Sequence, residues 1–108
     1  MANNIYYSPQ ALSDLDEIRV YITERLKNPI AADHTVEGIL RSISRLRLFS
    51  ETGSILRFSN GLNSDYRYVV YGNYLSFYHI MDEDVYIDRI LYGRRDYMRI
   101  LFSDLDAE

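Results

Sequence analysis

The sequence predicts an α+β fold in which a hairpin of two helices packs on an antiparallel sheet. Apolar residues recur at helical spacing from Ala11 to Leu46, and strand-like runs replace this period after Gly53. A run of helices followed by a run of strands is typical of such a fold. The 108 residues have the length of one domain, so we expect a single domain over residues 1–108.

The first half of the chain is predicted to contain one short strand and two helices. The opening strand is "NIYYS", and Ser8-Pro9 then supplies a helix cap and a residue suited to the first turn. The apolar spacing predicts helices near 8–27 and 29–49. Asn28-Pro29 separates them, with Asn28 as the second cap. So short a joint predicts an antiparallel pair.

The second half is predicted to form strands. "ILRFS" is a candidate strand, and three longer strands are expected at 65–72, 73–82 and 84–93. Gly72-Asn73 is a hairpin turn signal, and "DED" at 82–84 makes the next turn. The order is therefore β-α-α-β-β-β, followed by a short C-terminal tail, "DYMRILFSDL", that has helical character.

Composition limits the classes of function. The chain is 47% hydrophobic and 26% charged, the balance of a folded domain. Its net charge of −4 argues against non-specific binding to phosphates. It has no cysteine, no signal-peptide pattern and no apolar run long enough to span a membrane, so we expect a cytoplasmic protein without membrane association.

The sequence indicates no cofactor, no metal site and no small-molecule substrate. His34 and His79 lack the spacing of metal ligands, and the acidic turn lacks the alternating oxygens of a calcium loop. No phosphate-binding glycine loop and no G-x-S-x-G motif is present.

The arginines are the strongest functional signal, because eleven of the twelve cations are arginine. Arg67 and Arg89 lie inside predicted strands, whereas Arg94, Arg95 and Tyr97 follow the last strand. A cluster of Arg67, Arg95 and Tyr97 could hold a phosphate and stack a base. Alternatively, the two strand arginines are structural and pair with nearby acids, the candidates being Asp65, Asp88 and Asp96.

The order of these segments resembles the RelE/ParE superfamily of toxins from bacterial type II toxin–antitoxin modules. "YYSPQALSDLDEIRVYI" is similar to its first strand and helix, and "NPIAADHTVEGILRSISRL" to its second helix. "SDYRYVVYGNYLSFYHI" resembles its central hairpin, and "VYIDRILYGRRDYMRILF" its closing strand and tail. The resemblance implies the β-α-α-β-β-β fold and a toxin restrained by a cognate antitoxin.

The two branches of the superfamily differ in target. RelE-like toxins cut mRNA on the ribosome without a metal, whereas ParE-like toxins are implied to block DNA gyrase without a hydrolytic step. For a nuclease the catalytic candidates are Arg67, Arg95 and Tyr97. Since no histidine or lysine is expected near these arginines to take a proton, we favour the ParE-like branch. The alternatives are a RelE-like endonuclease, with ribosome and mRNA as partners, and a non-toxic binding module with the same fold.

Two surfaces follow from this interpretation. The target is expected to contact the residues around the strand exit: Arg94, Arg95, Tyr97 and Arg99. The antitoxin is expected to bind as a helix or added strand along apolar residues of the helices and the tail: Leu15, Ile18, Ile22, Ile39, Ile43, Ile100, Leu101 and Phe102.

Overall fold

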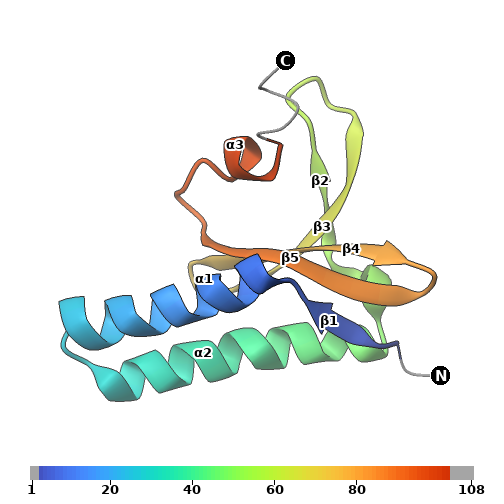
Figure 1. Cartoon of the computed structure of the whole chain (residues 1–108). Coiled ribbons are helices and arrows are strands. Elements are labelled where there is room, and N and C mark those ends of the chain that lie inside the picture. The colour runs from blue at the N-terminus through green and yellow to red at the C-terminus, as the bar shows by residue number, and fades with distance from the viewer. Residues whose placement is uncertain (1–2, 103–108) are drawn as a thin grey trace.

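The structure is a computed structural model that describes residues 3–102 (Figure 1). Its main elements are β1 (Ile5–Tyr7), α1 (Pro9–Val20), α2 (Pro29–Ser44), β2 (Ser54–Arg57), β3 (Asn63–Tyr71), β4 (Tyr74–Met81), β5 (Asp84–Tyr92) and α3 (Tyr97–Leu101). The predicted α+β class and element order are confirmed.

Both helix caps form as predicted. The Ser8 hydroxyl accepts a hydrogen bond from the backbone N–H of Ala11 at 2.9 Å. The Asn28 side chain accepts one from the N–H of Ala31 at 3.0 Å. Each cap satisfies an N–H group that the first helical turn leaves without an internal partner.

The two helices end differently from the expectation. A π-helical turn, Tyr21–Arg25, extends α1. The second helix was expected to continue to residue 49, but α2 ends at Ser44 and a 3₁₀ turn, Arg45–Arg47, follows. The carbonyl of Arg45 accepts from the N–H groups of both Leu48 and Phe49, so a tight turn satisfies the end of the helix.

The sheet has the strand order β1-β5-β4-β3-β2. Neighbours from β2 to β5 are antiparallel, as predicted, but β1 runs parallel to β5. A tight hairpin forces antiparallel pairing, whereas a long connection leaves either direction open. Since two helices and three strands separate β1 from β5, local sequence did not determine its direction.

Beyond the end of β1, Ser8 and the first part of α1 form hydrogen bonds with the backbone of β5. The pairing of β1 stops at Ile87, whose carbonyl accepts from the N–H of Ser8 at 2.9 Å. The Ser8 hydroxyl donates to the carbonyl of Asp88 at 2.8 Å, and the carboxylate of Asp14 accepts from the N–H of Ile90 at 2.9 Å. An exposed strand edge is thereby paired.

Helices cover both faces of the sheet (Figure 1). On one face, α1 and α2 pack on a core that includes Ile39, Ile43 and Tyr78. On the other, the short α3 packs on a second cluster centred on Phe77 and Leu91. None of the described helices is both long and apolar enough to cross a membrane.

Candidate functional site

Arg89 joins the sheet to the first helix. Its Nε donates to one carboxylate oxygen of Asp14 at 2.8 Å and its Nη2 to the other at 2.9 Å. The hydrogen bond with Asp14 raises the pKa of Arg89. Asp14 is 5% exposed and also holds the N–H of Ile90. Of the two alternatives for Arg89, the structural one holds, but its partner is none of the three acids named from the sequence: it is Asp14, 75 residues away in the chain.

Arg67 also has a structural role, through backbone carbonyls instead of a carboxylate. Its Nη1 donates to the carbonyls of Glu51 and Gly53, both at 3.1 Å. Tyr78 fixes the same turn: its hydroxyl donates to the carbonyl of Ser50 at 2.6 Å and accepts from the N–H of Gly53 at 3.0 Å. The two side chains therefore fix the turn from Ser50 to Gly53 that leads into β2.

The four residues predicted to contact a target divide into two groups. Arg94, Arg95 and Arg99 are exposed, and no ion pair holds any of them within residues 3–102. Tyr97 is partly buried, and its ring lies 5.2 Å from that of Phe77. Tyr97 therefore anchors α3 on the sheet, while the arginines around it face solvent.

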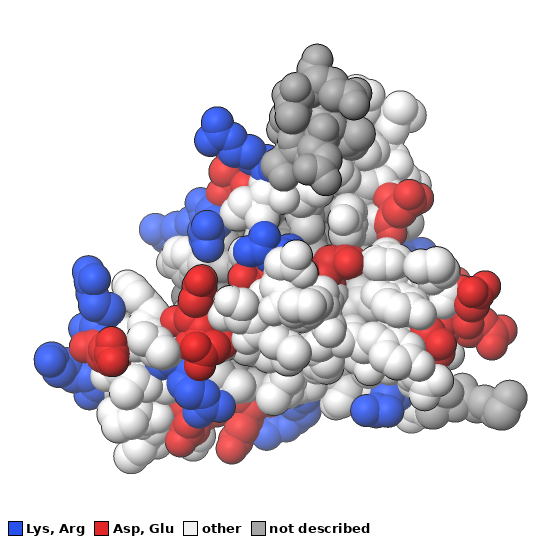
Figure 2. Space-filling view, in the orientation of Figure 1, with Lys and Arg blue, Asp and Glu red and all other residues white. Residues whose placement is uncertain are grey.

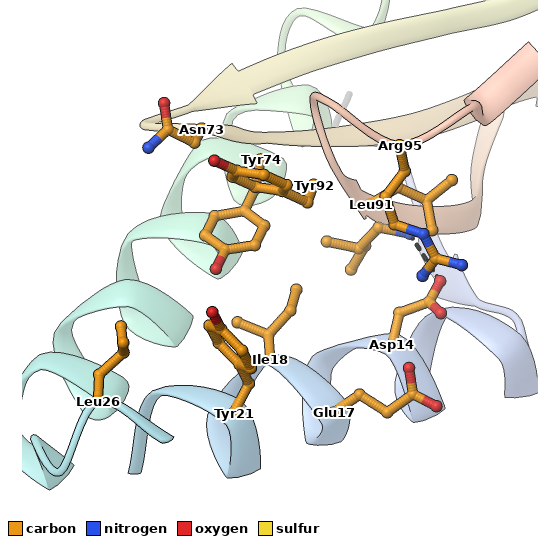
Figure 3. Close-up of a pocket in the computed structure, with 11 residues that line it drawn as sticks. Asp14, Glu17, Ile18, Tyr21, Leu26, Asn73, Tyr74, Leu91, Tyr92 and Arg95 are labelled. Atoms are coloured by element: carbon orange, nitrogen blue, oxygen red, sulfur yellow. Dashed lines mark hydrogen bonds between the residues drawn. The ribbon is translucent and has the colours of Figure 1, made fainter. Parts of the chain in front are cut away.

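Arg95 lines a cleft of about 610 Å³ between α1 and the end of the sheet (Figure 3). Asp14 and Glu17 lie beside Arg95 at one end. At the other end, Tyr21 of the π-helical turn faces tyrosines from the strands across the opening. Burial, followed by the neighbouring Tyr92 and Tyr21, raises the pKa of Tyr74. The cleft thus combines a charged end with a tyrosine-rich end, a composition typical of protein interfaces.

The residues predicted to bind an antitoxin do not form one surface. Those of the two long helices belong to the core or border it: Leu15, Ile18, Ile22, Ile39 and Ile43. Ile39 and Ile43 have no exposed surface, so they offer nothing to a partner in this conformation. The three tail residues, Ile100, Leu101 and Phe102, pack on the opposite face of the sheet. Only Ile18 lines the cleft.

A second hollow, of about 500 Å³, lies between β3 and β4, and both Arg67 and His79 are among the residues that line it. Counting back from the Gly72-Asn73 turn places Arg67 opposite Tyr78, so these two side chains share one face of the sheet and His79 projects to the other. No hydrogen bond or ion pair joins Arg67 and His79 among the described residues, so the expectation that no histidine near Arg67 can take a proton stays a prediction.

His79 is held firmly at this site. Its Nδ1 lies 2.6 Å from a carboxylate oxygen of Asp88. Its ring stacks on that of Tyr86, with 5.2 Å between the ring centroids, and forms an edge-to-face pair with that of Tyr66, whose centroid lies 6.4 Å away. Burial raises the pKa of Asp88, and the hydrogen bond to His79 opposes this rise. A carboxylate on one ring nitrogen orients an imidazole and leaves the other nitrogen for proton exchange.

No metal site is evident in the described part of the chain: across residues 3–102, no three side chains of His, Asp or Glu come together in a way that could hold an ion. The polar side chains that line the two hollows are arginine, carboxylate, tyrosine and asparagine, and the hollow between β3 and β4 adds one serine and one imidazole.

The described residues thus form a small α+β protein that carries exposed arginines beside a cleft. The chain belongs to the ParE toxin family of the type II toxin–antitoxin system parDE, whose family model matches residues 5–97.

Solved structures show the same fold. The chain is similar to a chromosomal ParDE toxin–antitoxin system from P. aeruginosa, with a TM-score of 0.68 and 19% identity over 84% of this chain and 96% of that one. It is also similar to the RelBE2 toxin–antitoxin complex from Mycobacterium tuberculosis, with a TM-score of 0.56 and 20% identity over 85% and 92% of the two chains. No curated protein matches the sequence.

Proposed function

We propose that the protein is a cytoplasmic toxin that inhibits bacterial growth by acting on DNA gyrase and is neutralised by a cognate antitoxin. The family match over residues 5–97 carries this proposal. The exposed arginines at the strand exit support a macromolecular target, because arginine is enriched where protein interfaces are strongest.

Within this proposal, Arg94, Arg95 and Arg99 contact the target directly. Tyr97 contributes by holding α3 against Phe77, which positions the three arginines around it. Arg95 also borders the cleft, so target and antitoxin would compete for this part of the surface.

The antitoxin is proposed to insert a helix into the cleft between α1 and the sheet. The exposed side chains of Tyr21, Leu26 and Tyr92 lie around this cleft and supply the apolar contacts. In this proposal these exposed residues contact the antitoxin instead of Ile39 and Ile43, which are buried. Calorimetry with the purified product of the neighbouring antitoxin gene should detect binding at micromolar concentration, and Tyr21→Ala should weaken it while leaving the fold intact.

The test of the target is inducible expression in bacteria, with and without the neighbouring antitoxin gene. We expect growth arrest that the antitoxin relieves, and loss of supercoiling activity when purified toxin is added to purified gyrase. Full gyrase activity at saturating toxin would contradict the proposed target. Absence of any growth effect would favour the non-toxic binding module.

The second candidate is a RelE-like mRNA endonuclease. The specific observation in its favour is that His79, oriented by Asp88, lies in the same hollow as Arg67. An imidazole can accept a proton from a 2′-hydroxyl, and an arginine can stabilise the charge that develops on a phosphate. Cuts at defined codon positions on induction, absent in His79→Gln, would establish this activity. We expect no such cuts.

A further inference from the structure

The sheet separates between β3 and β4. The pairing of these strands runs from the Gly72-Asn73 turn and stops at Arg67 opposite Tyr78. Continuing the register would place Asp65 opposite Ile80. Instead, the first part of β3 pairs only with β2, and Figure 1 shows the β2–β3 hairpin rising away from the β4–β5 hairpin.

Specific contacts maintain this separation. The Ser64 hydroxyl donates to the carbonyl of Leu56 at 2.6 Å and accepts from the N–H of Tyr66 at 3.1 Å, replacing ladder bonds where the register shifts. The ring of Phe102 lies 5.5 Å from that of Tyr66 and 4.9 Å from that of Phe58, so the end of α3 supports the raised hairpin. The divergence is therefore built into the structure.

The separation leaves backbone groups of β4 without partners. Residues flanking a two-residue hairpin turn form a hydrogen-bonded pair, and such pairs recur at every second residue. Counting from Tyr74, the N–H and C=O groups of Ser76, Tyr78 and Ile80 point toward β3. Within residues 3–102, no strand pairs with Ile80 on that side. A free strand edge is a template for an added strand.

The hollow at this edge is acidic. Among its lining residues, Glu51 and Asp65 are exposed carboxylates. Arg67, bound to neutral backbone carbonyls, keeps its positive charge and offsets one of the two, and His79 is paired with Asp88, so one negative charge remains in excess. The acidic turn Asp82–Asp84 lies at the tip of the same β4–β5 hairpin, where Figure 2 shows a group of carboxylates. An occupant should therefore carry positive charge.

We propose that an extended segment of the cognate antitoxin, carrying both apolar residues and arginine or lysine, adds to β4 at Ile80. The apolar ones would meet Ile55 and Ile80, and the basic ones Glu51 and Asp65. The net charge of −4 of this chain favours such a basic partner segment. The inference rests on the proposed function, because it requires an antitoxin.

Amide hydrogen exchange, measured by NMR on the full-length toxin with and without the purified antitoxin, tests the site. In the free toxin, the amide of Ile80 should exchange at least about 100-fold faster than that of Tyr78, which has a ladder partner. In the complex it should slow by at least about 100-fold. A complex in which Ile80 exchanges as in the free toxin would overturn the site while leaving the antitoxin established.

Other outcomes are also decisive. Failure to bind antitoxin by calorimetry would remove the proposed function and this inference with it. Slow exchange of Ile80 in the free toxin that depends on toxin concentration would identify a second copy as the occupant, against the proposal.

Charge reversal tests the occupant. Glu51→Lys combined with Asp65→Lys should weaken antitoxin binding at least about tenfold at low salt, since close charge complementarity governs such contacts. The matched control is Glu37→Lys, an exposed carboxylate on α2 that lies outside the hollow. Binding that is unchanged by the double substitution, or equally weakened by the control, would contradict a basic segment in this hollow.

Discussion

At the scale of the residue, Asp14 joins the first helix to the last strand of the sheet, a role that its neighbours in the sequence do not indicate. One buried carboxylate receives two bonds from Arg89 and one from the backbone of Ile90. A buried charge of this kind requires its partner, because removing the partner leaves the charge desolvated and unpaired.

We therefore expect Arg89→Ala to reduce the free energy of unfolding by about 3–5 kcal/mol. The measurement is urea denaturation at neutral pH. Arg19→Ala is the control: Arg19 pairs with Asp33 on the surface, where both side chains are well exposed, so its loss should cost less than about 1 kcal/mol. Equal losses for the two variants would show that Asp14 is not effectively buried.

Arg95 and Arg67 should separate toxicity from stability. The free energy of unfolding of Arg95→Ala should lie within about 0.5 kcal/mol of that of the unsubstituted protein, because the side chain is exposed. This variant should nevertheless lose growth inhibition.

Arg67→Ala removes two hydrogen bonds to backbone carbonyls, so its melting temperature should fall clearly. Melting temperature and growth arrest are measured on both variants, with antitoxin binding as the control for folding. A stable Arg95→Ala protein that remains fully toxic would move the target contact elsewhere.

At the scale of the element, α3 is a helix of five residues that cannot be stable alone. Its packing on Phe77 and Leu91 holds it. The described part of the predicted tail, which ends at Phe102, and the helix hairpin thus cover opposite faces of one sheet; the rest of that tail lies outside the described residues. Through Phe102, α3 also supports the raised β2–β3 hairpin.

Removing the ring of Tyr97 should release this element. In Tyr97→Ala we expect the amides of α3 to exchange at least about tenfold faster, whereas those of α1 change much less, because the loss is local to the second cluster. Hydrogen exchange with mass spectrometry measures both helices in one experiment. Arg99→Ala, an exposed position in the same helix, is the control and should leave both unchanged. A uniform increase across α1 and α3 would instead mean that the two cores unfold together.

At the scale of the whole molecule, tyrosines link stability to pH. Burial is the first cause of a raised pKa at Tyr7, Tyr66, Tyr74 and Tyr78. A raised pKa in the folded state means that the unfolded chain loses these protons first. The stabilisation is therefore complete below the ordinary pKa of 10.0 and is lost as the pH rises through the folded-state values.

Thermal melts between about pH 8 and pH 11 should accordingly show a constant melting temperature up to about pH 9 and a steep fall above pH 10. Tyr78→Phe removes one of these groups, so its melting temperature should start lower, because Gly53 loses its hydrogen-bond partner, and then fall less steeply. A flat profile to pH 11 would show that these hydroxyls titrate alike in the folded and unfolded chains.

The sequence by itself determined the parts of this protein whose signals are local. Ser8 and Asn28 mark the helix starts through bonds that span only three residues, and the glycine turn before Tyr74 sets one hairpin. Helical and strand-like periods lie within single elements, so the α+β class and its element order could be read without any partner segment.

Only the tertiary structure decided which distant groups meet. The parallel placement of β1, the pairing of Asp14 with Arg89 and the burial of Ile39 and Ile43 depend on how elements pack. The hollow that holds Arg67 and His79 arises because β3 leaves β4 partway along its length. The physical reason is that contacts across some 75 residues carry no periodic signal in either segment, since burial and pairing depend on the surface that the opposite element presents.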